Sequence, residues 1–139
     1  MTEDRLRWLN EFFGRKFPGA TGMRILGAGP DLVVGRFEVT EPLIAGTGFL
    51  FAPAIVAMAD TLCACGVGAH LREGESFTTV EFKTNFLGTA REGEIVEGRA
   101  TPAHLGRTTQ VWDTAVTNLT TGRTISLFRC TQLVLQPRA

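Results

Sequence analysis

The stretch that decides the fold is Phe51-Ala-Pro-Ala-Ile-Val-Ala-Met-Ala-Asp60-Thr-Leu-Cys-Ala-Cys-Gly66. It is long enough for a helix, and apart from weakly acidic thiols only Asp60 can carry a charge at neutral pH. Pro53 suits the first turn of a helix, where its missing N–H costs nothing. A surface helix would show a charged face, and this one has none, so the sequence predicts a helix buried in the core.

Asp60 is the residue of this helix that points to chemistry. A buried carboxylate without a partner is costly, so it has either a task or a satisfying neighbour. The alternative to a catalytic role is a structural carboxylate that is hydrogen-bonded to a neighbour such as Thr61 or Thr79. The free N–H groups of the first helical turn lie about two turns away and suit a polarised carbonyl or a developing oxyanion.

The pattern along the rest of the chain predicts helix, two strands, central helix and four strands. The expected elements are a helix over residues 3–14, strands over 23–27 and 32–39, the central helix over about 52–71, and strands over 77–87, 93–104, 108–119 and 124–135. An apolar helix followed by an antiparallel meander indicates a sheet that curls around that helix. The chain is expected to form one α+β domain over residues 1–139, with residues 1–17 as a helix and turn before the core.

Alternation along the strand over residues 77–87 assigns its side chains to two faces. Thr79 is expected to share one face with Glu81, Lys83 and Asn85. The other face is expected to carry Val80, Phe82 and Phe86.

The charge balance argues against nucleic acid as a partner. Lys and Arg number 14, Asp and Glu also number 14, and no basic stripe stands out. The 44% hydrophobic content suits an ordered globular protein and leaves apolar surface for contact with a second copy. The longest apolar run contains Asp60, Pro53 and several glycines, so it is interpreted as a core helix and not as a membrane span. No membrane is therefore expected as a partner.

The three cysteines do not form a disulfide framework. Cys63 and Cys65 are two residues apart in a helical pattern and point in different directions, and Cys130 lies in a strand pattern. Free buried thiols indicate a reducing compartment, and the charged N-terminus is not a signal peptide, so a cytoplasmic location is expected. With only two histidines, neither a metal site nor another cofactor is expected.

The segment around Asp60 and two later motifs together resemble a known family. The carriers are Ala57-Met-Ala-Asp60-Thr61, Thr78-Thr-Val-Glu-Phe-Lys-Thr-Asn-Phe-Leu87 followed by Glu92-Gly-Glu94, and His104-Leu-Gly-Arg-Thr-Thr109. Over roughly residues 20–135 the chain resembles hotdog-fold acyl-CoA thioesterases of the phenylacetate-degradation type, the group related to 4-hydroxybenzoyl-CoA thioesterase.

The resemblance implies hydrolysis of a small or aromatic acyl-CoA. Asp60 then acts as nucleophile or as general base for water, and the backbone N–H of Ala52 binds the thioester oxygen. A strand hydroxyl that places water or substrate maps onto Thr79, with Thr78 as the alternative. The resemblance also implies a homodimer or homotetramer whose site lies between subunits, with Asp60 of one chain facing Ala52 of the other, and it requires no cofactor.

The chain departs from the family at the start of the helix. Family members usually carry His-Gly-Gly there, and this chain carries Phe51-Ala52-Pro53. Phe51 would add apolar bulk near the thioester, and Pro53 has no N–H. Arg107 is a candidate for binding a CoA phosphate, because a guanidinium can donate two hydrogen bonds to phosphate oxygens at once. The alternative is a solvated arginine at the start of a strand.

Two other functions on the same fold remain open at this point. A hydratase or dehydratase acting on acyl thioesters needs an acid and a base, commonly a histidine paired with a carboxylate, and His104 is the candidate. A non-catalytic acyl-thioester-binding protein is favoured by the missing His-Gly-Gly.

Overall fold

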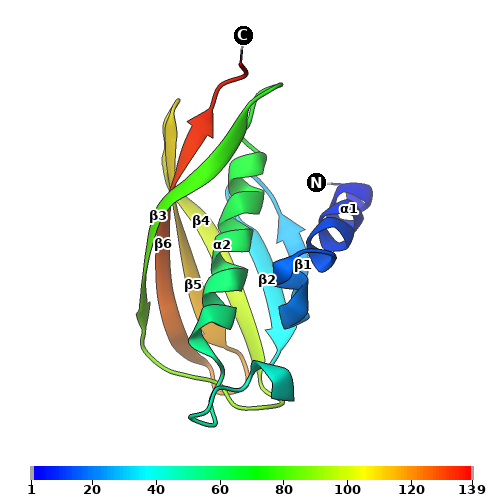
Figure 1. The fold of residues 1–139 in the computed structure, drawn as a ribbon, viewed down its shortest axis with the longest axis vertical. Helices are drawn as coiled ribbons and strands as arrows, with labels where there is room; N and C mark the ends of the chain where they lie inside the picture. Colours follow the sequence, from blue (N-terminus) through cyan, green and yellow to red (C-terminus); the bar gives the residue numbers. More distant parts are fainter. Residues whose placement is uncertain (1, 139) are drawn as a thin grey trace.

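The computed structural model describes residues 2–138 and shows a six-stranded antiparallel sheet curled around one helix, α2 (Ala52–Gly68) (Figure 1). The strands are β1 (Arg24–Ala28), β2 (Val33–Glu38), β3 (Ser76–Phe86), β4 (Ile95–Leu105), β5 (Thr109–Asn118) and β6 (Arg123–Leu135). The other helices are α1 (Glu3–Gly14) and two short 3₁₀ helices, Phe17–Thr21 and Glu41–Leu43. The predicted α+β hotdog fold is therefore confirmed.

Small residues on α2 let the sheet approach it closely. A Cβ added at Gly66 would lie 2.4 Å from the ring of Trp112, a fully buried side chain of β5. The helix ends at Gly68, earlier than the predicted end near Leu71. The chain leaves the helical path there, and the ring of His70 bonds the carbonyl of Pro30 at 2.7 Å.

The strand order is β1-β2-β4-β5-β6-β3, which differs from the predicted meander. Of the four strands after α2, only β4, β5 and β6 follow one another as neighbours, and β3 lies at the sheet edge beyond β6. The connection from β3 to β4 is too long for a hairpin and crosses the end of the sheet. On its way, the N–H of Leu87 bonds the carbonyl of Ile125 on β6, and the carbonyl of Ala90 accepts from Leu50.

A β-bulge at Val80 interrupts the pairing of β3 with β6. Thr79 lies opposite Gln132, and Glu81 lies opposite Thr131, so Val80 is an extra residue with no partner in the register. A bulge of this kind adds one residue to one strand and restarts the alternation of its side chains.

The bulge overturns the predicted faces of β3. Thr79 does not share a face with Glu81, Lys83 and Asn85, which lie on the outer side of the sheet. It points to the α2 side together with Phe82, whose ring stacks on a buried phenylalanine of β6. The prediction failed because strict alternation assumes that no residue is inserted.

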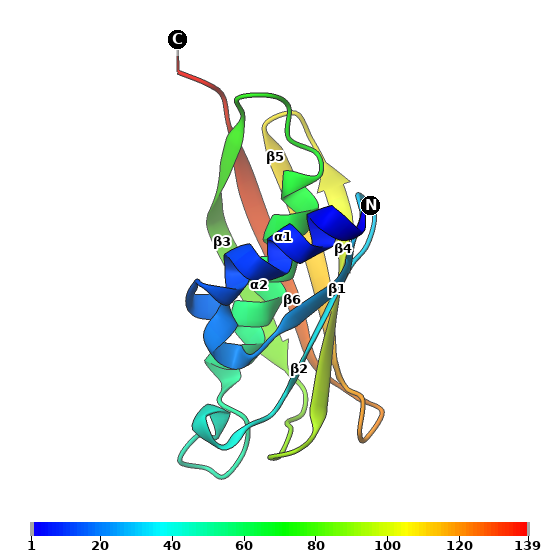
Figure 2. The ribbon, with the colours of Figure 1, turned by 90° about the vertical axis from the view of Figure 1, so that its right-hand side faces the viewer.

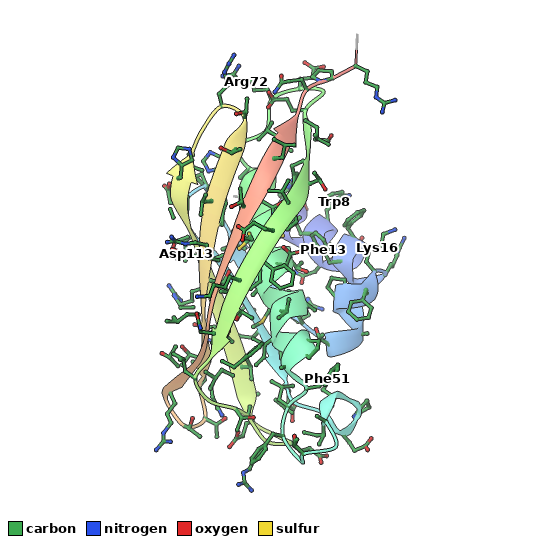
Figure 3. All side chains as sticks on the ribbon, turned by 60° about the vertical axis from the view of Figure 1, so that its left-hand side comes forward. Trp8, Phe13, Lys16, Phe51, Arg72 and Asp113 are labelled. Carbon is green, nitrogen blue, oxygen red and sulfur yellow. The ribbon has the colours of Figure 1, made fainter. Side chains whose placement is uncertain are left out.

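The two sides of the sheet differ in character. Figure 2 shows α1 beside β1, on the side that holds α2. The side chain of Asn10 fixes α1 to β1 through two bonds with the backbone of Ile25, of 2.8 and 2.9 Å. Figure 3 shows Asp113 on the opposite side, where it accepts two hydrogen bonds from Arg129, of 2.6 and 2.7 Å. Within residues 2–138, no helix is long and apolar enough to cross a membrane.

Candidate active site

Asp60 lies near the middle of α2 and faces β3 across a polar contact. It is half-buried, so the chain alone does not enclose it fully. Burial raises the pKa of the Asp60 carboxyl, and hydrogen bonds from the side chains of Thr79 and Gln132 lower it in part. The net effect is a carboxylate that is more basic than an ordinary aspartate, which suits a general base or nucleophile.

Thr79 contacts both Asp60 and Gln132. Its Oγ1 lies 3.4 Å from Oδ1 of Asp60 and 3.0 Å from Oε1 of Gln132. Thr78 lies opposite Leu133 and therefore points to the other face of the strand. Of the two threonines that the sequence left open, Thr79 is the one beside Asp60.

Gln132 was missed by the sequence reasoning. It lies on β6, its side chain is 0% exposed, and its Nε2 donates to Sγ of Cys130 at 3.3 Å. The sequence signal for Gln132 was its position in β6. It lies in the same every-second-residue row as the apolar residues Phe128, Cys130 and Val134, which point to α2. A polar side chain in a row of buried residues needs a hydrogen-bond partner, and for Gln132 that partner is Thr79 of the candidate site.

Two of the three free cysteines lie next to the site. Sγ of Cys63 lies 3.1 Å from the hydroxyl of Thr114. Contact with the Cys130 thiol, together with burial, raises the pKa of the Cys63 thiol. Cys63 therefore stays protonated and is a poor nucleophile, in agreement with its assignment to the core.

Ala52, whose N–H is the predicted oxyanion group, is the first residue of α2. Phe51 uses its N–H to bond the carbonyl of Leu43, and its own carbonyl accepts from Ala54. No described residue accepts a hydrogen bond from the N–H of Ala52. The side chain of Phe51 is 52% exposed at this end of the molecule (Figure 3).

Ala52 and Asp60 lie apart within one chain. At 1.5 Å per residue, eight residues along a helix separate them by about 12 Å. A thioester carbonyl held by the Ala52 N–H of one chain is therefore out of reach of the Asp60 carboxylate of that same chain.

Arg107 lies in the exposed turn between β4 and β5, at the same end of the sheet as the C-terminus of α2 (Figure 1). The structure does not bring it to the Asp60 contact. His104 pairs with Val111, whose neighbours Gln110 and Trp112 point to α2, so His104 faces the outer side. Within residues 2–138, no histidine is hydrogen-bonded to Asp60, and no cluster of histidine, cysteine and acidic residues could hold a metal.

Comparison with known proteins places the chain in a family. Residues 47–125, more than half of the chain, match the model of the thioesterase superfamily. The chain is 27% identical over 117 residues to 1,4-dihydroxy-2-naphthoyl-CoA hydrolase of Listeria monocytogenes, covering 84% of this chain and 94% of that protein.

Solved structures agree. A thioesterase of Haemophilus influenzae superposes with a TM-score of 0.86 and 27% identity, covering 94% of this chain and 90% of the other. A thioesterase of Pseudomonas aeruginosa with 24% identity has the same fold, with a TM-score of 0.87 and coverage of 94% and 93%. The resemblance drawn from the sequence is confirmed: the chain belongs to the thioesterase superfamily.

Proposed function

We propose that this protein hydrolyses acyl-CoA thioesters, with Asp60 as the nucleophile or general base. The observation that carries the proposal is the Asp60–Thr79 contact on the α2 side of a thioesterase-superfamily fold. A relative named as a naphthoyl-CoA hydrolase supports an aromatic acyl group, and small acyl groups are the alternative.

The chemistry needs one base, one oxyanion site and water. As a general base, Asp60 takes a proton from water, and the resulting hydroxide adds to the thioester carbon. As a nucleophile, Asp60 adds directly, and water then hydrolyses the mixed anhydride. In both routes the C–S bond breaks, CoA leaves as thiolate or thiol, and the acyl group becomes a carboxylic acid.

The oxyanion site comes from a second copy of the chain in this proposal. The Ala52 N–H of one copy holds the carbonyl oxygen, helped by the positive end of the α2 dipole, and Asp60 of the other copy attacks the carbon or activates the attacking water. The distance of about 12 Å along α2 supports this division, since one chain cannot place both groups on one carbonyl. β3 supplies the means of association, because it forms a long edge of the sheet with no strand beyond it in the described chain.

Apolar side chains along β3 supply a wall for the acyl group in this proposal. Phe82 and Phe86 lie on the α2 side of β3, where they remain about half exposed. Phe82 is held in place by stacking on Phe128, with ring centroids 5.4 Å apart. Phe51 of the second copy adds bulk at the thioester end, in place of the histidine that the family resemblance implies, and Arg107 is a candidate for a CoA phosphate.

Release of free thiol from short, medium, long and aromatic acyl-CoAs tests the proposal. Asp60→Asn keeps the size of the side chain and removes its charge, so turnover on the preferred substrate should fall by at least about 10²-fold. Asp113→Asn is the matched control, because Asp113 lies on the outer side of the sheet and pairs with Arg129. Its turnover should remain near that of the wild type.

Two results would overturn the proposal. Retained turnover in Asp60→Asn would make Asp60 a structural carboxylate. Absence of thiol release from the whole panel, combined with thermal stabilisation of the wild type by an acyl-CoA, would identify a non-catalytic binder. The substitution of Phe51-Ala52-Pro53 for His-Gly-Gly is the observation that favours this second function.

A further inference from the structure

Gln132 places a polar amide at a fully buried position, and its presence there needs a physical explanation. It is fully buried in β6, beneath α2 and beside β3. An apolar residue there would match its neighbours in the row and would avoid the cost of burying an amide. All polar side-chain atoms buried in the described chain have partners, so the amide of Gln132 is satisfied by what surrounds it.

The groups around Gln132 are the Thr79 hydroxyl and, beside it, the Asp60 carboxylate, which is the proposed reacting group. The Oε1 atom accepts from Thr79 at 3.0 Å, and the Nε2 atom donates to Sγ of Cys130 at 3.3 Å. The side chain of Gln132 also lowers the pKa of the Asp60 carboxyl. The hydroxyl of Thr79 has one proton and two acceptors within reach, Oε1 of Gln132 at 3.0 Å and Oδ1 of Asp60 at 3.4 Å. Gln132 therefore competes with Asp60 for that proton.

We propose that Gln132 is a positioning residue for the hydrolysis: its amide fixes the Thr79 hydroxyl and the Asp60 carboxylate relative to each other, so that the carboxylate presents a free oxygen to water or to the thioester carbon. This inference rests on the proposed function. Oε1 of Gln132 holds the Thr79 hydroxyl in line beside the Asp60 carboxylate. Gln132 makes no contact with substrate and acts through Asp60 and Thr79.

Few other groups titrate near Asp60. On α2 the neighbour is Cys63, whose thiol pKa is raised by its contact with Cys130 and by burial. On β6 it is Cys130 itself, on which Glu81 acts from β3 across the sheet. β3 and β5 otherwise present the hydroxyls of Thr79 and Thr114. The carboxyl of Asp60 is therefore the group expected to set the acidic limb of the rate profile.

The first test compares Gln132→Met with a matched control, Gln110→Met. Gln110 is a buried glutamine on the neighbouring strand, directly opposite Gln132 in the register, and its amide is bonded to Trp112 at 2.9 Å. In Gln132→Met the acidic limb of kcat should move to higher pH, because the amide that lowers the pKa of the Asp60 carboxyl is gone. The plateau of kcat should fall about tenfold, with KM changed less than about twofold.

Gln110→Met should lower the melting temperature and leave both the limb and kcat in place. The same shift in both variants, or no shift in Gln132→Met, would overturn the proposal. Gln132→Glu should move the limb further than Gln132→Met, because a second carboxyl beside Asp60 disfavours its ionisation.

A second measurement needs neither turnover nor an altered Gln132. In the wild type, the side-chain amide protons of Gln132 should change chemical shift with the same midpoint as the carboxyl carbon of Asp60, and that titration should vanish in Asp60→Asn. A flat amide signal while Asp60 titrates would overturn the proposal even if thiol release is normal. A coupled titration in a protein that releases no thiol would leave the contact standing and reject the proposed function instead.

Discussion

The hydroxyl of Thr79 on β3 lies 3.4 Å from the carboxylate of Asp60 on α2, although strict alternation would turn Thr79 to the outer side of the sheet. The extra residue Val80 makes the contact possible, since it lets both Thr79 and Phe82 point to α2. Bulges recur next to active sites because they re-aim one side chain without disturbing the rest of the strand.

Separate substitutions of Thr78 and Thr79 on β3 distinguish a role in the site from a role in the strand. Thr79→Val keeps β-propensity and shape but removes the hydroxyl, so kcat should fall about tenfold through loss of one hydrogen bond to a charged group. Thr78→Val is the control, because Thr78 lies opposite Leu133 on the outer face. Steady-state kinetics should show its kcat within about twofold of the wild type, and an equal loss in both variants would contradict the register.

The features that the sequence predicted correctly depend on local pattern. The absence of charge outside Asp60 identified α2 as the central helix, and alternation with turn residues located the strands to within a few residues. Asp60 itself stood out because it is the one carboxylate in an apolar run.

The features that were missed depend on contacts between distant segments. The place of β3 beyond β6 and the bulge at Val80 are fixed by pairing with β6, some fifty residues later. Thr78, Thr79 and Val80 are all good strand formers, so nothing local says which of them is the extra residue. Gln132 became a site residue only when β6 was placed against β3 and α2.

Asp60→Asn should raise the melting temperature near neutral pH. Burial raises the pKa of Asp60 in the folded protein above its value in the unfolded chain, so the ionised form destabilises the fold. The penalty is full above the folded pKa, and it disappears as pH falls below the unfolded pKa of about 3.9. Thermal melts from pH 7 to pH 4 should show the gain shrinking as pH falls. A variant that melts below the wild type at pH 7 would show that the ionised carboxylate stabilises the fold.

Gly66→Ala tests how closely α2 packs on the sheet. Its Cβ would lie 2.4 Å from the Trp112 ring, and overpacking of this kind costs about 1–3 kcal/mol. Gly68→Ala is the control, because a Cβ there has nothing within 4 Å, and alanine is the better helix former. Urea unfolding should give a lower midpoint for Gly66→Ala and an unchanged or higher midpoint for Gly68→Ala. Equal midpoints would mean that Trp112 can move aside freely.

A site shared between two copies predicts that two inactive variants restore activity when combined. Asp60→Asn removes the base, and Ala52→Pro removes the N–H proposed for the oxyanion. Proline is tolerated in the first helical turn, and Phe51 already has the extended backbone, with φ −63° and ψ 118°, that a following proline requires. In a mixed dimer one site carries both changes and the other carries neither. Unfolding and refolding the two variants together at equal amounts makes half of the dimers mixed, so thiol release should recover to about a quarter of the wild-type rate. Each variant refolded alone is the control and should stay inactive. Mass spectrometry should show that the mixture contains mixed dimers. If it does and activity does not recover, Asp60 and Ala52 of the same chain would have to form the site, which contradicts the shared site inferred from the distance of about 12 Å between them.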